Sequence, residues 1–357
     1  MLRKFSLFRI LAGAESQPGA SPIRTFNLCL IGFGHVGRSL VGLLHRKAAD
    51  LRERYGIAYR ITGVATRRLG WLVAENGFAA DRLLNGDYSE AADVGGLGQW
   101  LAAAKPQALF EASSLNAETG EPAITYLRAA LEAGAHAVSA NKGPVVYAHR
   151  KLTQLAQARG LRFYYESAMM DGAPVFSLFR ETLPAIDLRG FRGVLNSTTN
   201  VILGCMESGM SFDDAVREAQ RLGVAETDPS KDIDGIDAAV KVVGLANVLM
   251  DGSLTLSDVT RKGIRGLTTA NLREAREKGE AWKLIGRARR ESDGTISASV
   301  VPERVAPDDP MYSVCGASLS AAFQTDVFEL IVGERDPGPE ATAYGMLCDF
   351  INAVRSS

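Results

Sequence analysis

The sequence predicts an α/β protein of two domains, an N-terminal doubly wound parallel sheet followed by an α+β domain. Short apolar strands alternate with amphipathic helices over residues 22–143, a pattern that implies right-handed crossovers and parallel strands. A glycine-rich turn joins the first strand to the first helix. The chain has 357 residues, which is long enough for two domains of ordinary size.

The elements of the first domain follow from hydrophobic periodicity. The first strand covers residues 26–31, and the helix after it places four apolar side chains on one face, Val36, Leu40, Leu43 and Leu44. We expect further strands at residues 57–65, 107–112 and 136–139, with a helix at 122–133.

After residue 143 the pattern changes, and we predict the second domain over residues 144–335. Its expected helices cover residues 146–158, a stretch from about 200, 211–222 and 235–250, and its expected strands cover 161–166, 189–196, two segments within 281–304, and 326–332. Residues 336–357 are predicted to form a C-terminal helix that returns to the first domain. Residues 1–21 begin with basic side chains among apolar ones, Arg3, Lys4 and Arg9, followed by a stretch without basic residues. We interpret them as a disordered extension, with a short amphipathic or targeting segment as the alternative.

Charge and cysteine content exclude several classes of protein. The net charge is −1, and no basic stretch of useful length indicates a nucleic-acid partner. No apolar run of about 18 residues is present, so no transmembrane helix is expected. The four cysteines lie far apart without a C-x-x-C pair, which disfavours a zinc site or a disulfide framework and favours a reducing, cytoplasmic setting.

The glycine-rich turn has the G-x-G-x-x-G spacing of a Rossmann-type dinucleotide site, with Gly32, Gly34 and Gly37 at the glycine positions and His35 and Val36 between the last two. It follows an apolar strand and opens a helix, which is the context that the motif requires. The first glycine permits a tight turn, the second lets the backbone approach a pyrophosphate, and the third lets helix and strand pack closely. A glycine-rich turn that binds no nucleotide is the less favoured alternative.

The second strand ends in arginines rather than in a carboxylate. An acidic residue there would recognise the ribose 2′-hydroxyl of NAD, whereas arginine can pair with the 2′-phosphate of NADP. Arg67 therefore favours NADP, with NAD still possible, and a solvated loop arginine is the alternative.

Two lysines are candidates for chemistry. Lys241 lies four residues after Asp237 in an otherwise apolar helix, so the two are either an ordinary surface pair or are drawn into a cleft. Lys142 follows a predicted parallel strand, at the edge where ligands bind in open α/β sheets. The histidines are dispersed and indicate no metal site.

Several stretches resemble the homoserine dehydrogenase family from about Asn27 onward, in the family's order: IGFGHVGRSL, LNAETGEPAITYLRAALEAGAHAVSANKGPV, YYESA, NSTTNVILGCME and AETDPSKDIDGIDAAVKV. The resemblance implies reversible, NAD(P)H-dependent reduction of L-aspartate 4-semialdehyde to L-homoserine, a step of threonine, methionine and isoleucine biosynthesis. It also implies a homo-oligomer that associates through the substrate-binding second domain. A C-terminal regulatory domain found in some members is absent, so we expect the short form.

The resemblance assigns roles by position. Lys241 corresponds to the proton donor, and Lys142 to the lysine between cofactor and substrate. Glu226 corresponds to the carboxylate that holds the substrate amino group, with Asp232 and Asp237 beside it. The implied site residues are thus Lys241, Lys142 and Asp237 as catalytic, Glu226, Asp232 and Thr198 for substrate, and Gly32, Gly34, His35, Val36, Gly37, Arg67, Ser113 and Lys142 for the cofactor.

The family also holds a monovalent cation, Na⁺ or K⁺, which by position would be bound by Glu166, Met169, Asp171 and Ala173, mostly through backbone oxygens. The sequence departs from the family's glycine-rich pattern at residues 168–174, at Ser197 and at residues 333–338. Two alternatives therefore stay open. One is a dehydrogenase of the same fold for another amino or hydroxy aldehyde. The other is a non-catalytic nucleotide-binding protein, which is less favoured because the lysines and carboxylates are present.

Overall fold

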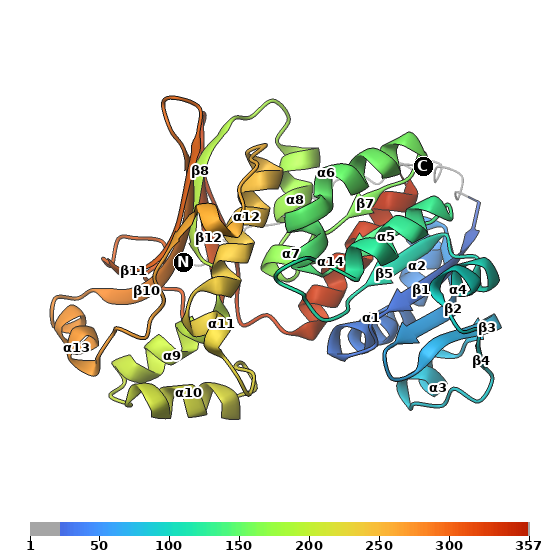
Figure 1. The fold of residues 1–357 in the computed structure, drawn as a ribbon, viewed down its shortest axis with the longest axis horizontal. Helices are drawn as coiled ribbons and strands as arrows, with labels where there is room; N and C mark the ends of the chain where they lie inside the picture. The colour runs from blue at the N-terminus through green and yellow to red at the C-terminus, as the bar shows by residue number, and fades with distance from the viewer. Residues whose placement is uncertain (1–21, 356–357) are drawn as a thin grey trace, which may run out of the picture.

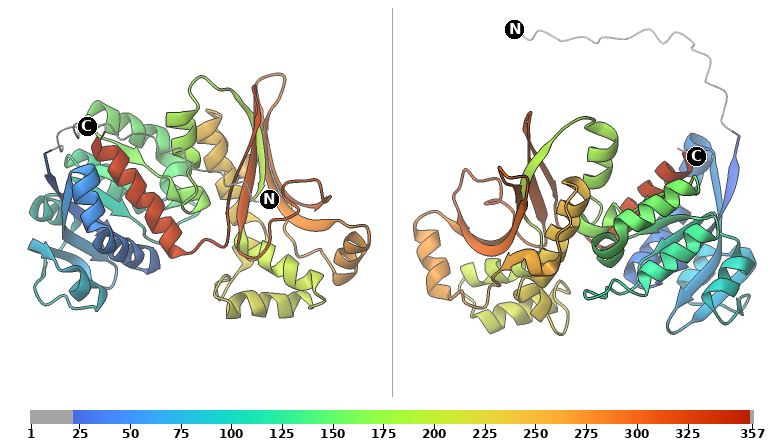
Figure 2. Two further views of the ribbon diagram at one scale, coloured as in Figure 1. Left: turned by 180° about the vertical axis from the view of Figure 1, so that it is seen from behind. Right: turned by 45° about the horizontal axis from the view of Figure 1, so that its top comes forward.

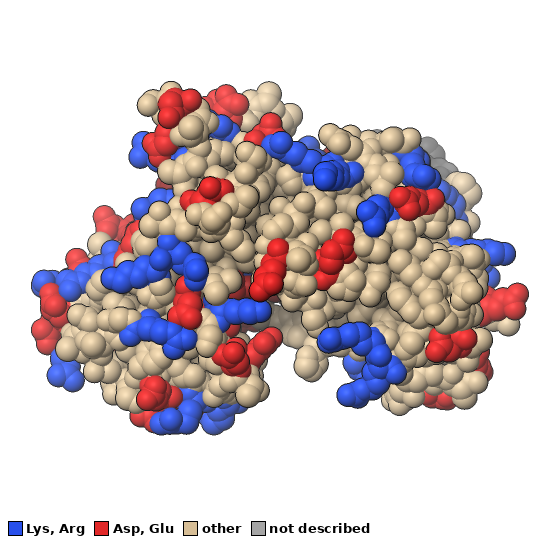
Figure 3. Space-filling view, in the orientation of Figure 1, with Lys and Arg blue, Asp and Glu red and all other residues tan. Residues whose placement is uncertain are grey.

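The computed structural model describes residues 22–355, so the extension predicted for residues 1–21 lies outside the described part of the chain. Two lobes lie side by side, each built on one β-sheet (Figure 1). The space-filling view shows a hollow between the lobes and a mixture of acidic and basic side chains over this face (Figure 3). Among the described residues, no helix is both long and apolar enough to cross a bilayer.

The first sheet has seven strands in the order β4-β3-β2-β1-β5-β6-β7. The strands are β1 Arg24–Ile31, β2 Ile57–Thr66, β3 Gly70–Phe78, β4 Ala92–Asp93, β5 Ala108–Glu111, β6 His136–Ser139 and β7 Phe163–Tyr164. Strands β2, β1, β5, β6 and β7 pair in parallel, which confirms the predicted doubly wound sheet. Strands β3 and β4 add antiparallel pairs that the sequence reasoning did not predict.

Helices cover both faces of this sheet. They are α1 His35–Arg46, α2 Ala48–Tyr55, α3 Ala80–Leu84, α4 Leu97–Ala104, α5 Ala123–Glu132, α6 Lys142–Ala158 and the C-terminal α14 Pro339–Arg355. Helices α1 and α14 pack side by side on one face (Figure 2). There Phe350 of α14 places its ring 5.7 Å from the rings of both Phe26 and Phe110. The chain's last helix thereby completes the core of the first lobe.

The second sheet has six strands in the order β13-β12-β8-β10-β11-β9, mixed in direction. Its strands are β8 Leu188–Val194, β9 Val259–Arg261, β10 Ala281–Arg290, β11 Ile296–Val305, β12 Leu319–Thr325 and β13 Glu329–Glu334. Its lobe also contains the helices α9 Ser197–Glu207, α10 Phe212–Arg221, α11 Ser230–Ile233, α12 Ile236–Leu249 and α13 Thr269–Glu277. Helix α12 contacts β10 and β11 and also reaches α6 of the first lobe.

Helix α6 starts earlier than the sequence pattern indicated, and the first sheet extends further. Helix α6 begins at Lys142 rather than at residue 146, because Asn141 caps it by accepting a hydrogen bond from the Gly143 N–H, and Pro144 is tolerated in a first helical turn. Strand β7 joins the first sheet, so that sheet continues past residue 143. The short helices α7 Ser167–Met170 and α8 Val175–Ser177 and the π-helical turn Leu178–Thr182 then lead to β8.

Candidate active site

A large cavity opens at the carboxyl ends of β1, β2 and β5. Its volume is about 1410 Å³, and its lining includes Gly32 to Gly34, Arg67 and Ser113 to Asn116. Ligands of open α/β sheets bind at this edge, where the strand order reverses. The cavity is therefore in the place that a dinucleotide would occupy.

The glycine turn is shaped for close approach of a ligand. Gly32 has φ +91, and a Cβ there would lie 2.4 Å from the carbonyl oxygen of Ala112, so only glycine fits. A Cβ on Gly37 would lie 2.4 Å from the Gly32 carbonyl oxygen, whereas a Cβ on Gly34 would meet no atom within 4 Å. No side chain caps α1, so its first N–H groups remain available to a phosphate. This turn fits a pyrophosphate-bearing cofactor.

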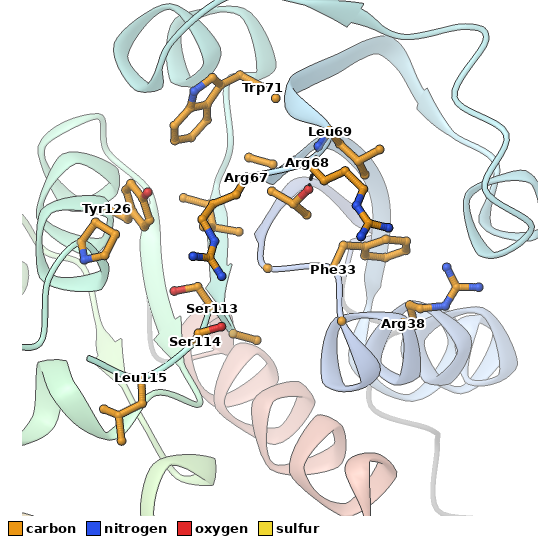
Figure 4. Close-up of a pocket in the computed structure, with 18 of the residues that line it drawn as sticks. Phe33, Arg38, Arg67, Arg68, Leu69, Trp71, Ser113, Ser114, Leu115 and Tyr126 are labelled. Carbon is orange, nitrogen blue, oxygen red and sulfur yellow. Dashed lines mark hydrogen bonds between the residues drawn. The ribbon is translucent and has the colours of Figure 1, made fainter. Parts of the chain in front are cut away.

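Three arginines line the cavity, Arg38, Arg67 and Arg68. Figure 4 shows Arg67 pointing inward toward Ser113, while Arg38 and Arg68 lie on either side of Phe33. Among the described residues, neither Arg67 nor Arg68 forms an ion pair, and both are exposed. Two guanidinium groups without a carboxylate partner make this end of the cavity attractive to an anion.

A buried glutamate organises the cavity's floor. Glu111 ends β5 with no exposed surface, and its carboxylate accepts hydrogen bonds from the Ser113 N–H at 2.8 Å and from the Ser139 hydroxyl at 2.8 Å. The Asn141 side chain in turn donates to the Ser113 carbonyl at 3.3 Å. Burial raises the pKa of the Glu111 carboxyl. This network fixes the loop after β5 against the N-terminus of α6, and the sequence reasoning did not select Glu111.

The two candidate lysines meet at one carboxylate. Lys142 Nζ lies 3.1 Å from Asp237 Oδ1, and Lys241 Nζ lies 4.0 Å from Asp237 Oδ2. Lys241 is only 7% exposed. Asp237 and Lys241 are therefore largely enclosed beside Lys142 where α12 meets α6, and they are not an ordinary exposed surface pair.

These contacts give the two lysines different acidities. Asp237 holds the pKa of Lys142 above its usual range. Burial lowers the pKa of Lys241, which Asp237 only partly offsets. Burial alone would raise the pKa of Asp237, but the charges of both lysines outweigh it and hold that pKa at about 2. The site thus combines a firmly charged lysine with one that releases its proton more readily.

Asn196 connects a second carboxylate to the cluster. Its amide donates to Asp232 Oδ1 at 2.6 Å and to Asp237 Oδ2 at 3.1 Å. Its Oδ1 accepts from the Thr199 N–H at 2.8 Å and so caps α9. Burial raises the pKa of Asp232, and the charge of Asp237 adds to this. Asn196 lies within a stretch that resembles the family, but the sequence reasoning did not assign it a role.

Two predicted substrate residues lie apart from this cluster. Glu226 is exposed, and only its backbone carbonyl accepts a hydrogen bond, from the Gln220 side chain. Thr198 is buried, and its hydroxyl donates to the Val224 carbonyl at 3.1 Å. Their predicted contacts with substrate therefore remain predictions.

The four predicted cation-binding residues lie on one turn, but their side chains point to different partners. Both carboxylate oxygens of Glu166 accept backbone N–H groups, at 2.6 and 2.7 Å. Met169 is buried, and Asp171 Oδ1 accepts from the Thr342 hydroxyl at 3.1 Å. Over residues 22–355, no group of three or more His, Cys, Asp or Glu side chains is arranged to hold a metal. The predicted cation contacts, mostly through backbone oxygens, therefore remain a prediction.

A dinucleotide-shaped cavity next to a lysine–aspartate cluster defines the class of an NAD(P)-dependent dehydrogenase. Comparison with known families agrees with this class. The family model described as homoserine dehydrogenase matches residues 174–351, and the one described as homoserine dehydrogenase, NAD binding domain, matches residues 32–166.

Relatives resemble the chain over most of its length. The chain is 37% identical to the NAD(+)-dependent homoserine dehydrogenase of Pseudomonas canavaninivorans, and the alignment covers 93% of this chain and 97% of that protein. It is 34% identical to the homoserine dehydrogenase of Sulfurisphaera tokodaii, with 91% of this chain and 97% of that protein covered. Among solved structures, a hyperthermophilic archaeal homoserine dehydrogenase in complex with NADPH superimposes with a TM-score of 0.78 at 28% identity, covering 94% of this chain and 99% of that one. The homoserine dehydrogenase of Thiobacillus denitrificans gives a TM-score of 0.81 at 29% identity, covering 94% and 74%. The chain belongs to the homoserine dehydrogenase family.

Proposed function

We propose that this chain interconverts L-aspartate 4-semialdehyde and L-homoserine with NADP as its preferred cofactor, within threonine, methionine and isoleucine biosynthesis. The observation that carries the proposal is the cluster of Lys142, Asp237 and Lys241 next to the dinucleotide cavity. Bound cofactor supplies the hydride that reduces the aldehyde carbon. The protein must then stabilise and protonate the oxygen that becomes negative.

Lys241 is the residue we assign to that proton transfer. Its pKa is lowered by burial, and a general acid is most effective when its pKa lies near the working pH. In the direction of reduction its ammonium gives a proton to the developing alkoxide. In the direction of oxidation its neutral amine accepts the proton of the alcohol.

Lys142 and Asp237 hold the proton donor in place. Lys142 stays charged because Asp237 favours its protonated form, so it adds a fixed positive charge beside the reacting oxygen. Asp237 orients both ammonium groups, and the amide of Asn196 orients Asp237 in turn.

The cofactor is assigned to the cavity at the edge of the first sheet. The turn from Gly32 to Gly37 would hold the pyrophosphate, Ser113 would contact the cofactor, and Arg67 would pair with a 2′-phosphate. One relative is named as NAD(+)-dependent and one neighbouring structure is an NADPH complex. The two unpaired arginines support NADP for this chain.

A single assay tests the proposal. Purified protein is supplied with L-aspartate 4-semialdehyde and either NADPH or NADH, and cofactor oxidation is followed by absorbance, with and without Na⁺ or K⁺. We expect turnover that is faster with NADPH. Tight NADPH binding without turnover on this aldehyde would contradict the proposal.

That outcome would favour the second candidate, a dehydrogenase of the same fold for a different amino or hydroxy aldehyde. The specific observation behind it is Asp171, a charged side chain in the turn where the family keeps glycine. Assay of related aldehydes and alcohols would then identify the substrate.

Three further features of the predicted function rest on indirect support. A homo-oligomer through the second lobe is supported by the family resemblance. A cytoplasmic setting is supported by the four cysteines, which are all free thiols. Stimulation by Na⁺ or K⁺ is supported by the position of the Glu166–Ala173 turn next to α6 and α12, since α7 contacts both helices.

A further inference from the structure

The turn that departs from the family's glycine pattern lies against both lysine-bearing helices. Helix α7, which ends at Met170, contacts α6 and α12. The side chain of Met169 packs directly on Gly244, where a Cβ would lie only 2.1 Å from its Cε. Gly244 follows Lys241 by three residues, so both lie on one face of α12. Asp171 is the next residue after α7, so it directly follows a helix that packs on both lysine-bearing helices.

Asp171 keeps an unusual backbone conformation there. Its φ is 49 and its ψ is −109, a conformation that glycine adopts easily and that costs energy for other residues. The turn is held from two sides. The Gly172 N–H donates to Glu334 of β13 at 3.0 Å, and a Cβ on Gly172 would lie 2.5 Å from the Ala341 carbonyl oxygen of α14. The two segments that depart from the family pattern, residues 168–174 and 333–338, therefore support each other.

The carboxylate of Asp171 acts on the catalytic cluster. The pKa of Lys142 is raised mainly by Asp237, and the pKa of Lys241 is lowered mainly by burial. The charge of Asp171 raises the pKa of each lysine further. Only Oδ1 of Asp171 has a hydrogen-bond partner among the described residues, the hydroxyl of Thr342. Its second oxygen remains available to a ligand.

The charges of the cluster suit a substrate with a positive group. Three carboxylates, those of Asp171, Asp232 and Asp237, influence the two lysines, so acidic side chains outnumber basic ones in the cluster. Glu226, which the family resemblance assigns to the substrate amino group, is exposed and forms no side-chain contact with these residues. An ammonium group next to these carboxylates would offset the surplus of acidic side chains.

We propose that Asp171 determines substrate specificity, its free carboxylate oxygen receiving the ammonium group of an amino alcohol or amino aldehyde next to the Lys142–Asp237–Lys241 cluster. The inference rests on the proposed function, since it names the residue that selects an amino-bearing substrate. It adds a contact that a glycine at this position could not make.

The test compares L-homoserine with 4-hydroxybutanoate, which lacks only the amino group. Both are measured as substrates with NADP⁺, and 4-hydroxybutanoate is also measured as a competitive inhibitor. In Asp171→Asn we expect KM for L-homoserine to rise about 10- to 100-fold, as for loss of one charge-assisted hydrogen bond. The inhibition constant of 4-hydroxybutanoate and kcat should change little.

Two variants control for folding. Asparagine tolerates positive φ, and Asp171→Gly also adopts this conformation without a carboxylate, so both should fold and give the same loss of preference. Asp251→Asn is the matched control, because Asp251 also has a positive φ of 52 but is an exposed residue paired with Arg150. It should retain wild-type constants.

The results separate this inference from the proposed function. If the wild-type protein does not oxidise L-homoserine, the proposed function fails. If the wild-type protein is active but Asp171→Asn keeps the wild-type preference, or loses turnover on both compounds equally, Asp171 does not select the amino group and the inference is overturned.

Discussion

Replacing Lys241 by methionine tests the assigned proton transfer most directly. Methionine keeps the length and apolar stem of the side chain and removes only the ammonium. General acid–base catalysis contributes about 10²- to 10⁴-fold to rate. Lys241 is 7% exposed, so water has little access to replace it, and we expect the upper part of this range. A loss of about 10³- to 10⁴-fold corresponds to roughly 4–5.5 kcal/mol in the activation barrier.

The same change should leave the fold intact. Asp237 keeps Lys142 at 3.1 Å and the Asn196 amide at 3.1 Å, so it is not left without partners. Two charges 4 Å apart attract by about 4 kcal/mol at an effective dielectric constant of 20, but the lowered pKa of Lys241 shows that burial costs its charged form more than Asp237 returns. Because Asp237 keeps these two other partners, we expect Lys241→Met to change the unfolding temperature little.

The measurement has three parts: steady-state turnover in both directions, NADPH affinity by fluorescence titration, and thermal unfolding. Lys241 does not line the cofactor cavity, so NADPH affinity should be unchanged. Lys231→Met is the matched control, because Lys231 is an exposed lysine of the same acidic segment. The role of Lys241 would be refuted if turnover fell by less than about tenfold, far under the usual contribution of a general acid. It would also be refuted if weaker NADPH binding explained the loss of turnover.

Three other changes test the cofactor site and the acidity of the cluster. Arg67→Ala should weaken NADP binding about 10- to 100-fold, as for loss of one charge-assisted pair, with NAD little affected; equal losses would rule out 2′-phosphate recognition. Gly34→Val should abolish cofactor binding without loss of thermal stability, since its Cβ meets no protein atom within 4 Å. Gly32→Ala should lower both cofactor binding and thermal stability, because its Cβ would lie 2.4 Å from a backbone oxygen. Similar melting temperatures for the two variants would contradict this difference. The rate of L-homoserine oxidation should rise with pH as Lys241 loses its proton. Because Asp237 raises the pKa of Lys241, Asp237→Asn should move that rise to lower pH in a profile of kcat/KM against pH. A move to higher pH would show that another group titrates.

The fold of the first lobe could be predicted where local pattern and tertiary structure agree. The strand at residues 26–31 and the glycine turn after it lie as expected. Strand β3 was missed although it contains the apolar run Trp71 to Ala74. Gly70, at φ +75, lets the chain fold back so that this run pairs with β2. Strand β12 was also missed. Its sequence LSAAFQT is rich in small residues of low strand propensity, and it forms a strand because β8 and β13 pair with both of its edges.

The active site could be predicted only as separate parts. Lys142 was selected from its place after a parallel strand and Lys241 from its spacing of four residues from Asp237, but no local pattern indicates that Lys142 also contacts Asp237. That contact depends on α12 of the second lobe packing against α6 of the first. Glu111 carried a weak signal, a carboxylate at the end of an apolar strand, and its function becomes evident only when the hydrogen bonds to Ser113 and Ser139 are seen.

The position of Asp237 explains why cofactor binding and catalysis should respond differently to mutation. The cofactor cavity is built from the first lobe alone, so it needs no contribution from α12. The proposed proton donor, Lys241, belongs to α12 and pairs with Asp237, which also binds the first residue of α6. Changes on α12 should therefore reduce turnover while cofactor affinity is retained. Changes at Lys142, which begins the helix beside the cavity, should affect both, because that residue lies where the two lobes meet.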